Sequence, residues 1–341
     1  MKISYIILLL LVAICAKADE GNPAIKIIQP LDRSIYVSSH ANLVIDTLDT
    51  NITKIVLYVN DKHTEELNIT SEKRTYCKAI IIKLGENNIK LNTYAGDMLL
   101  QSSKLQLYYY SELYENAEEE SEEYEKRYFH TGVKEDKCKA CHDMSSNVPT
   151  DGEAFEDVTR TTCYGCHEKM MDTRNSHAPA ANWLCLDCHN GKAGEYNMDQ
   201  QGLVKYLVRD PVARTCGTCH EDIEGWFMKE YTHGPTNDGR CIRCHNPHGS
   251  DNEFFLRKPV WDLCTTCHAE KANGKHVIPA IGFGRNPTAG GHPTKDRKDP
   301  ARKGRDFYCS SCHNPHGSEG IFLLRMKGSF TYGVCQRCHQ K

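Results

Sequence analysis

The pattern Cys-x-x-Cys-His occurs eight times between residues 138 and 339, and it constrains this 341-residue chain more than any other feature. The eight copies use sixteen of the eighteen cysteines, and only Cys15 and Cys77 lie outside them. Cysteines of an exported protein usually form disulfides, and Cys-x-x-Cys is also a zinc-binding pattern. Neither use requires a histidine directly after the second cysteine, yet all eight copies have one.

This arrangement is typical of covalent haem attachment. Two thiols on one turn of helix add to the two vinyl groups of one haem, and the histidine that follows ligates the iron. The sequence therefore predicts eight covalently bound haem c groups. The predicted attachment residues are Cys138, Cys141, Cys163, Cys166, Cys185, Cys188, Cys216, Cys219, Cys241, Cys244, Cys264, Cys267, Cys309, Cys312, Cys335 and Cys338. The predicted proximal ligands are His142, His167, His189, His220, His245, His268, His313 and His339.

Seven further histidines in the same region are the candidate distal ligands. They are His130, His177, His233, His248, His276, His292 and His316. Two histidines on each iron would give low-potential centres without an open site, whereas a methionine would raise the potential.

Seven candidates leave one of the eight irons without a distal histidine. Four explanations stay open: His40 or His63 from the N-terminal region, Met144 or Met228, a histidine from a neighbouring subunit, or an open iron.

The eight motifs form four units of two. His130, His177 and His233 each stand eight residues before the first motif of a unit, and His292 stands further back. The third and fourth units share Cys-x-x-Cys-His-Asn-Pro-His-Gly-Ser, at residues 241–250 and 309–318. This region resembles the doubled-CXXCH multihaem c-type cytochrome family. The resemblance implies that the histidine of Pro-His-Gly is a distal ligand, which applies to His248 and His316. The first two units lack that segment, so their second ligands stay open.

The density of motifs also predicts the fold of residues 130–341. Eight haems leave roughly 26 residues of chain for each, too few to build an ordinary apolar core. We expect an octahaem cytochrome c domain of four di-haem repeats, in which mostly short helices and loops wrap around the covalently bound haems.

The N-terminus has the form of an export signal. Lys2 precedes the apolar run Ile6–Ile14, and Ala16-Lys17-Ala18 forms a small-x-small cleavage site. Residues 1–18 are therefore predicted to be a signal peptide and the protein to be exported. A lipid anchor on Cys15 is disfavoured because Ile14 is bulky for a lipidation site. No other stretch approaches the roughly twenty apolar residues of a membrane span.

Residues 19–110 predict an all-β, antiparallel sandwich. β-Branched and aromatic residues alternate with polar ones between turn residues. The expected strands are Ala24–Ile28, Ile35–Val37, Leu43–Thr47, Lys54–Val59, Glu65–Ile69, Cys77–Leu84, Asn88–Tyr94 and Leu99–Tyr110. The stretch from Leu84 to Ile89, followed by a further strand, resembles a bacterial immunoglobulin-like domain, which implies a binding or spacer module. Cys77 is expected to be buried in the core, and the alternative is a reactive thiol.

Residues 111–129 contain eight glutamates and predict an acidic, solvated linker. A cation or partner site there is the alternative. The formal net charge of −3 gives no electrostatic case for nucleic acid as a partner.

Three function classes are compatible with these features. The favoured one is an electron carrier, periplasmic or extracellular, that exchanges electrons with redox partner proteins or an extracellular acceptor. A homo-oligomeric haem filament is a variant of it. The second is an octahaem reductase or oxidase of a small nitrogen or sulfur compound, which needs one open iron. The third is a surface adhesin whose β domain is primary.

Overall fold

The computed structural model describes residues 23–114, 123–145, 161–189, 204–272, 292, 294–325 and 332–339. The predicted signal peptide and His276 lie outside these residues. The chain divides into two compact units. The first contains most of the N-terminal strands, and the second contains strand β2 and everything from residue 106 onward.

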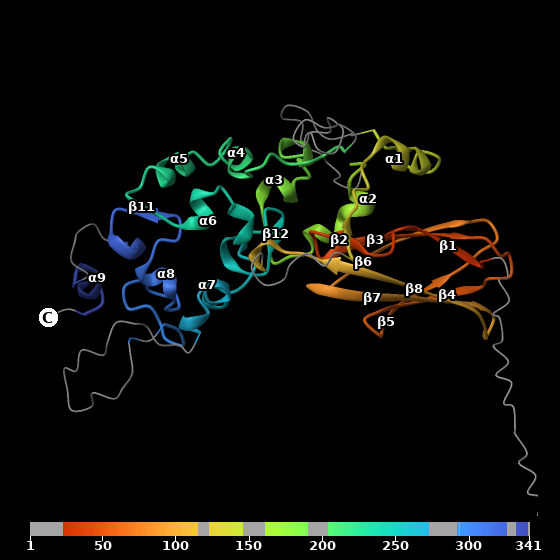
Figure 1. Cartoon of the computed structure of the whole chain (residues 1–341), viewed down its shortest axis with the longest axis horizontal. Coiled ribbons are helices and arrows are strands. Elements are labelled where there is room, and N and C mark those ends of the chain that lie inside the picture. Colours follow the sequence, from red (N-terminus) through yellow and green to blue (C-terminus); the bar gives the residue numbers. More distant parts are fainter. Residues whose placement is uncertain are drawn as a thin grey trace, which may run out of the picture. The chain divides into compact units, whose positions relative to one another are not determined.

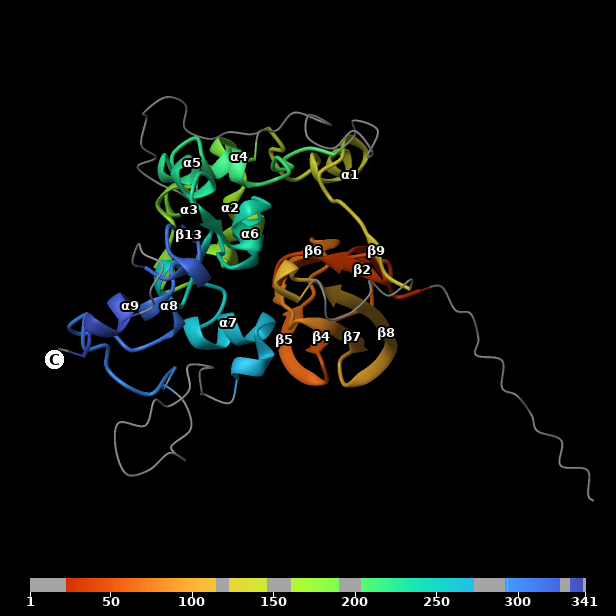
Figure 2. The ribbon, with the colours of Figure 1, turned by 60° about the vertical axis from the view of Figure 1, so that its left-hand side comes forward.

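The N-terminal strands form two sheets, and Figures 1 and 2 show β4, β7 and β8 running side by side in the larger one. The smaller sheet has the order β1-β3-β6, and the larger has the order β5-β4-β7-β8-β2-β9. Their bounds are β1 Ile25–Gln29, β2 Ser34–Tyr36, β3 His40–Thr47, β4 Lys54–Val59, β5 Lys62–Asn68, β6 Thr75–Ile81, β7 Gly85–Ala95, β8 Met98–Tyr109 and β9 Glu125–Lys126.

Alternation of side chains builds the core of this part. Ala41, Leu43 and Ile45 of β3 are at most 1% exposed, because every second residue of a strand faces the same side. Ile89 and Leu91 of β7 are likewise fully buried. The predicted N-terminal all-β sandwich is confirmed, and all eight expected strands are present.

The expectation of a wholly antiparallel sandwich is wrong at β2. This strand pairs in parallel with both β8 and β9, with Ser34 opposite Leu107 and Glu125. β9 lies inside the segment predicted to be an acidic linker, so strand pairing continues past Tyr110. The reason is that β2 offers a free edge, which the backbone of residues 125–126 occupies without an apolar pattern of its own.

The predicted burial of Cys77 is also wrong. Tyr76 and Ile80 of β6 are buried, whereas Cys77 and Ile81 are exposed. A short run of isoleucines identifies a strand but not which alternate residues face the core.

We expect one thiol of the mature haem-loaded protein to react with a maleimide under native conditions. Cys77 is exposed, while thioether bonds would block the sixteen motif cysteines. Mass spectrometry should find one adduct per chain, and the Cys77→Ser variant should show none. Several adducts on the wild-type protein would contradict complete haem attachment.

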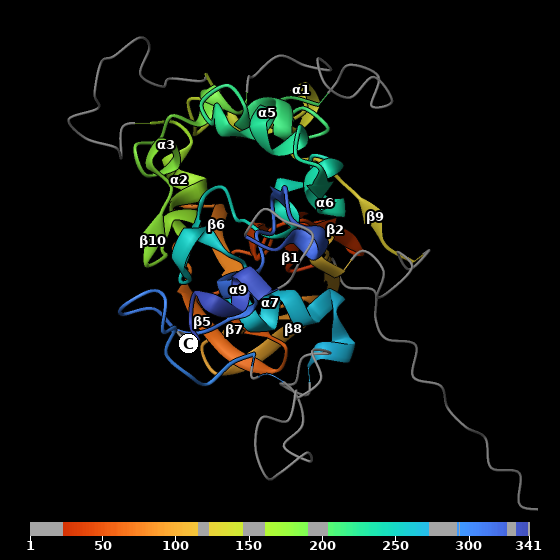
Figure 3. The ribbon, with the colours of Figure 1, turned by 90° about the vertical axis from the view of Figure 1, so that its left-hand side faces the viewer.

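The described part of the region from residue 130 onward consists of short helices and two-residue strands separated by loops, as Figure 3 shows for α2, α3, α5, α6, α7 and α9. The helices are α1 Gly132–Cys138, α2 Tyr164–His167, α3 Ala178–Ala181, α4 Ala213–Cys216, α5 Asp222–Phe227, α6 Gly234–Asn237, α7 Val260–Cys267, α8 Cys309–Cys312 and α9 Tyr332–Gln336. The small strands are β10 Asn175–Ser176, β11 Tyr231–Thr232, β12 Gly249–Ser250 and β13 Gly317–Ser318. The prediction that this region consists of short helices and loops is confirmed. Among the described residues, no helix has the length and apolar character to cross a membrane.

Candidate haem sites

Six pairs of histidine rings face each other in the described part of the motif region. Their ring centres are 6.0 to 6.3 Å apart. With metal–nitrogen bonds of about 2 Å, two imidazoles that ligate one iron from opposite sides have ring centres about 6 Å apart. The pairs are His130–His167, His177–His220, His189–His248, His233–His268, His245–His316 and His292–His339. The donor chemistry and the spacing therefore fit iron held between two histidines.

Each pair joins one motif histidine to one candidate distal histidine. Six of the seven candidates are used once each, and His276 lies outside the described residues. In five pairs the ring planes are within 31° of parallel, whereas the planes of His292 and His339 cross at 86°.

The pairing follows two rules. The histidine upstream of a unit faces the second motif of that unit, as His177 faces His220. The histidine of Pro-His-Gly faces the first motif of the preceding unit, as His248 faces His189 and His316 faces His245. The two histidines of a Pro-His-Gly pair thus come from neighbouring units, which interlocks the units along the chain.

Two-residue strand ladders hold these crossed histidines in place. β10, directly before His177, pairs antiparallel with β12, directly after His248. The His177 backbone N–H also donates to the His248 carbonyl at 3.3 Å. β11 and β13 repeat the arrangement around His233 and His316.

The glycine of Pro-His-Gly is required by this close approach. Gly249 has φ +144°, and a Cβ atom there would lie 2.6 Å from the Asn175 carbonyl oxygen. Gly317 has φ +152° and would place a Cβ 3.0 Å from the Trp226 carbonyl oxygen. Only glycine fits comfortably where two backbones pass at this distance.

Backbone carbonyls orient several of the described imidazoles. Nδ1–H of His245 donates to the Phe254 carbonyl at 2.8 Å, and His313 makes the same contact with Phe322 at 2.6 Å. Phe254 and Phe322 have φ of 58° and 55°, which turns their carbonyls toward the rings. These hydrogen bonds leave Nε2 of each ring available to an iron. Sequence reasoning assigned Phe254 and Phe322 no role.

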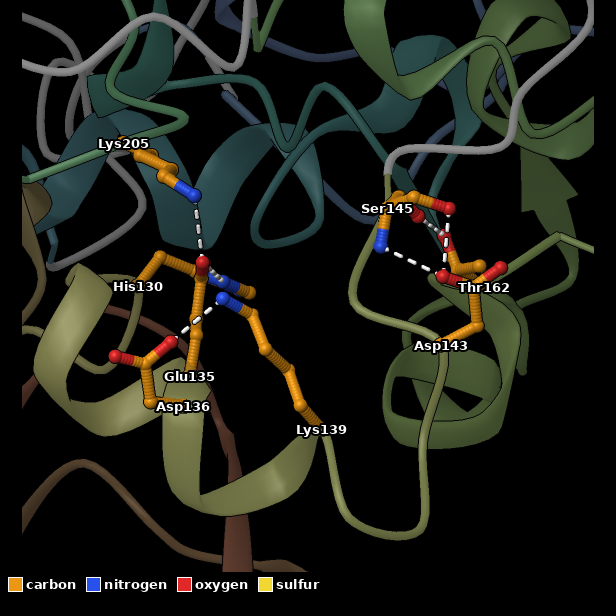
Figure 4. Close-up of polar contacts among 8 residues, drawn as sticks. All are labelled: His130, Glu135, Asp136, Lys139, Asp143, Ser145, Thr162 and Lys205. Atoms are coloured by element: carbon orange, nitrogen blue, oxygen red, sulfur yellow. Dashed lines mark hydrogen bonds and ion pairs between the residues drawn. The ribbon is translucent and has the colours of Figure 1, made fainter.

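His130 differs because a carboxylate orients it. Figure 4 shows Glu135 of α1 between His130 and Lys205. Nδ1–H of His130 donates to Glu135 Oε1 at 3.0 Å, and Lys205 Nζ donates to Oε2 at 2.6 Å. Burial alone would raise the pKa of Glu135, but the hydrogen bonds from Lys205 and His130 outweigh it and lower the pKa. Sequence reasoning missed both Glu135 and Lys205.

The attachment cysteines of successive motifs lie beside one another. Three pairs of thiols lie close enough to shift each other's pKa, which is lowered for the first-named and raised for the second-named member of each pair: Cys163 and Cys185, Cys241 and Cys216, and Cys309 and Cys264. The thiol pKa is raised by burial and by the charge of the next motif's cysteine in three further cases, Cys188 near Cys219, Cys244 near Cys267, and Cys312 near Cys338. The hydroxyl of Thr162 donates to the Ser145 carbonyl at 2.7 Å and so joins the first motif to the second. The motifs thus follow one another in space in their sequence order.

His142 of the first motif has no imidazole ring facing it among the described residues. His40 is half-buried at the start of β3, where its Nδ1 lies 3.2 Å from Ser39 Oγ. His63 is exposed on β5 and packs edge-on against the Tyr58 ring. Neither ring is in contact with a motif histidine in the described part of the chain, so the eighth ligand is not assigned.

Comparison with known proteins identifies the motif region. A family model described as the doubled CXXCH motif matches residues 130–172, 177–225, 233–273 and 299–341, just over half of the chain. The multihaem cytochrome MtrA of Shewanella baltica is 30% identical over 175 residues, which cover 46% of each protein. The high-molecular-weight cytochrome c of Nitratidesulfovibrio vulgaris is 25% identical over 167 residues, 42% of this chain and 30% of that protein. The chain therefore spans less than half the length of these curated relatives.

The N-terminal part is similar to fibronectin(III)-like modules of Clostridium thermocellum CbhA. That match has 12% identity and a TM-score of 0.21, and it covers 26% of this chain and 96% of the module. A match to Bacteroides uniformis β-glucuronidase 3 has 17% identity and a TM-score of 0.22, and covers 27% of this chain and 12% of the enzyme.

Proposed function

The chain belongs to the doubled CXXCH family of multihaem c-type cytochromes, and on that premise we propose that it is an octahaem electron carrier. Each haem, when bound, supplies an iron that accepts and releases one electron. The polypeptide then has three tasks, which are to attach the haems, to ligate each iron, and to arrange the sites in a continuous series.

The observation that carries the proposal is the serial arrangement of the motifs. The Ser145–Thr162 hydrogen bond joins the first motif to the second, and from the second motif onward each motif has a cysteine close enough to a cysteine of the next to influence its pKa. Because each motif would hold one haem, a series of adjacent motifs supports transfer along the chain rather than chemistry at one centre.

The facing histidines support the same assignment. The two imidazoles in each of six pairs would ligate one iron from both sides and leave it no exchangeable position. We assign His276 to the same class of ligand as the other six candidates. Saturated irons suit electron transfer, because they leave no position for a substrate to bind.

Location and partners follow from the class of protein. c-Type haem is attached outside the cytoplasm, which agrees with residues 1–18 as a signal peptide. The partners are then redox proteins or an electron acceptor in the periplasm or outside the cell. A filament of identical subunits is the variant in which another copy supplies the eighth histidine.

The test is performed on the purified mature protein. A haem-to-protein ratio of eight, low-spin spectra for at least seven haems, and uptake of eight electrons in a reductive titration are expected. The reduced protein should pass those electrons to a soluble ferric complex. A ratio clearly below eight, or haems that an electrode does not reduce reversibly, would refute the proposal.

A second candidate function rests on His142 and His313, the two motif histidines that none of the six ring pairs includes. His276 can serve at most one of them, so the haem of the other motif is the place where a small nitrogen or sulfur compound would bind in a reductase. A catalytic current with nitrite, hydroxylamine or sulfite would favour the reductase over the carrier. A low-spin spectrum for all eight haems would remove it.

A further inference from the structure

The Nδ1 atom of His130 contacts a carboxylate, that of Glu135. The Nδ1 atoms of His177, His189 and His245 donate instead to the carbonyls of Pro247, Tyr206 and Phe254. A carboxylate carries a full negative charge, whereas a carbonyl carries only a partial one. The His130–His167 site therefore differs electrically from the other described sites with known Nδ1 partners.

Glu135 is held firmly in this position. Its side chain is only 2% exposed, and it accepts one hydrogen bond on each oxygen. The Lys205 backbone N–H donates to the His130 carbonyl at 2.9 Å, and Thr131 forms a β-bridge with Val204. These backbone contacts fix Lys205 and His130 on either side of the carboxylate.

The carboxylate of Glu135 is shielded from water, whereas the side chains of His130 and Lys205 are 31% and 30% exposed. Rings of Phe129 and Tyr206 pack edge-on against His130, with centres 5.1 Å and 4.8 Å away. A charge in such a place is weakly screened, so its effect on the imidazole is larger than that of a surface carboxylate.

We propose that Glu135 is a positioning residue that lowers the reduction potential of the iron between His130 and His167. The proposal rests on the proposed function, because it takes His130 as a ligand. A carboxylate that accepts the Nδ1 proton makes the imidazole more basic at Nε2 and so a stronger donor to iron. The extra electron density stabilises the ferric form relative to the ferrous form. The reduction potential for uptake of one electron is therefore lower. The shared proton stays between Nδ1 and Oε1.

The segment of residues 204–206 contacts both this site and the next one along the chain. Lys205 neutralises part of the charge on Glu135, and the carbonyl of the adjacent Tyr206 accepts the hydrogen bond of His189 at 2.7 Å. Tyr206 has φ 62°, a conformation that non-glycine residues seldom adopt. Residues 204–206 thus serve ligands of both the second and the third motif.

The test compares Glu135→Gln with Asp136→Asn in the haem-loaded full chain, by spectroscopic titration against an electrode. Both variants remove one negative charge from α1, but Asp136 is exposed and contacts Lys139 instead of His130 (Figure 4). In Glu135→Gln, the reduction potential of one of the eight haem equivalents should rise by about 59 mV. For a one-electron step, this makes that haem about tenfold easier to reduce. Asp136→Asn should leave the curve essentially unchanged.

A second variant keeps the test decisive if Glu135→Gln fails to incorporate all haems. Lys205→Met retains the carboxylate but removes its counter-charge, so one equivalent should shift to lower potential. A role in folding alone would not give shifts of opposite sign. Curves of both variants that coincide with the wild-type curve, at full haem content, would overturn the proposal. Failure of the wild-type protein to be reduced reversibly would instead reject the proposed function.

Discussion

Produced without haem attachment, the full chain is expected to keep its N-terminal sheets and to lose the helices of residues 130–341. The reason lies in the distribution of buried apolar side chains. Among the described residues, the buried apolar core belongs mainly to residues 24–124. Beyond residue 130 it consists of Trp183, Val204, Ala213, Ile223, Leu263 and Phe307.

Six isolated side chains cannot stabilise this region. Ordering the backbone costs about 1–2 kcal/mol for each residue, and helices of four to eight residues are not stable on their own. Large side chains such as Phe254 and Phe322 are 61% and 74% exposed, so the polypeptide covers less than half of their surface. Porphyrin rings would supply the missing apolar surface.

Circular dichroism and limited proteolysis of the haem-free chain would measure this. We expect a β-type spectrum and a resistant fragment that ends near residue 126. The haem-loaded chain, treated identically, should resist cleavage in its motif region. A protease-resistant 130–341 region in the haem-free chain would show that the polypeptide builds a core of its own.

The sequence predicts local features well where one pattern has one structural cause. The strands follow from alternation, and the motifs follow from a fixed chemical spacing. Cys77 was misplaced because alternation leaves open which side of β6 faces the core. β9 was missed because Glu125 and Lys126 show no strand pattern, and their pairing depends on the edge of β2.

Pairing of the ligands could not be predicted in the same way. Sequence reasoning found His248 as a candidate but could not tell which iron it serves, because its partner His189 lies in another unit. That pairing is set by the contact of β10 with β12, a non-local feature. Glu135 was missed since a single glutamate in a charged helix carries no signal until His130 and Lys205 are placed beside it.

The second large effect is expected from His248→Ala. The ring of His248 faces that of His189 at 6.1 Å, so its loss should leave the iron of the third motif with one protein ligand. The backbone contacts survive the change, because His177 donates to the carbonyl of His248 and not to its side chain. We therefore expect full haem content, with one of the eight haems converted from low-spin to high-spin and able to bind carbon monoxide when reduced.

His63→Ala is the matched control for this experiment. It removes an imidazole of the same size from β5, where His63 contacts Tyr58 and not a motif histidine. Electron paramagnetic resonance should detect the new high-spin signal in His248→Ala alone, and carbon monoxide should bind about one additional haem per chain. The histidine of each Pro-His-Gly segment faces the first motif of the preceding unit. His316→Ala should therefore open the site of His245 in the same manner. A low-spin spectrum in both variants would mean that His189 and His245 share their irons with other ligands, and the crossed pairing of the units would then be wrong.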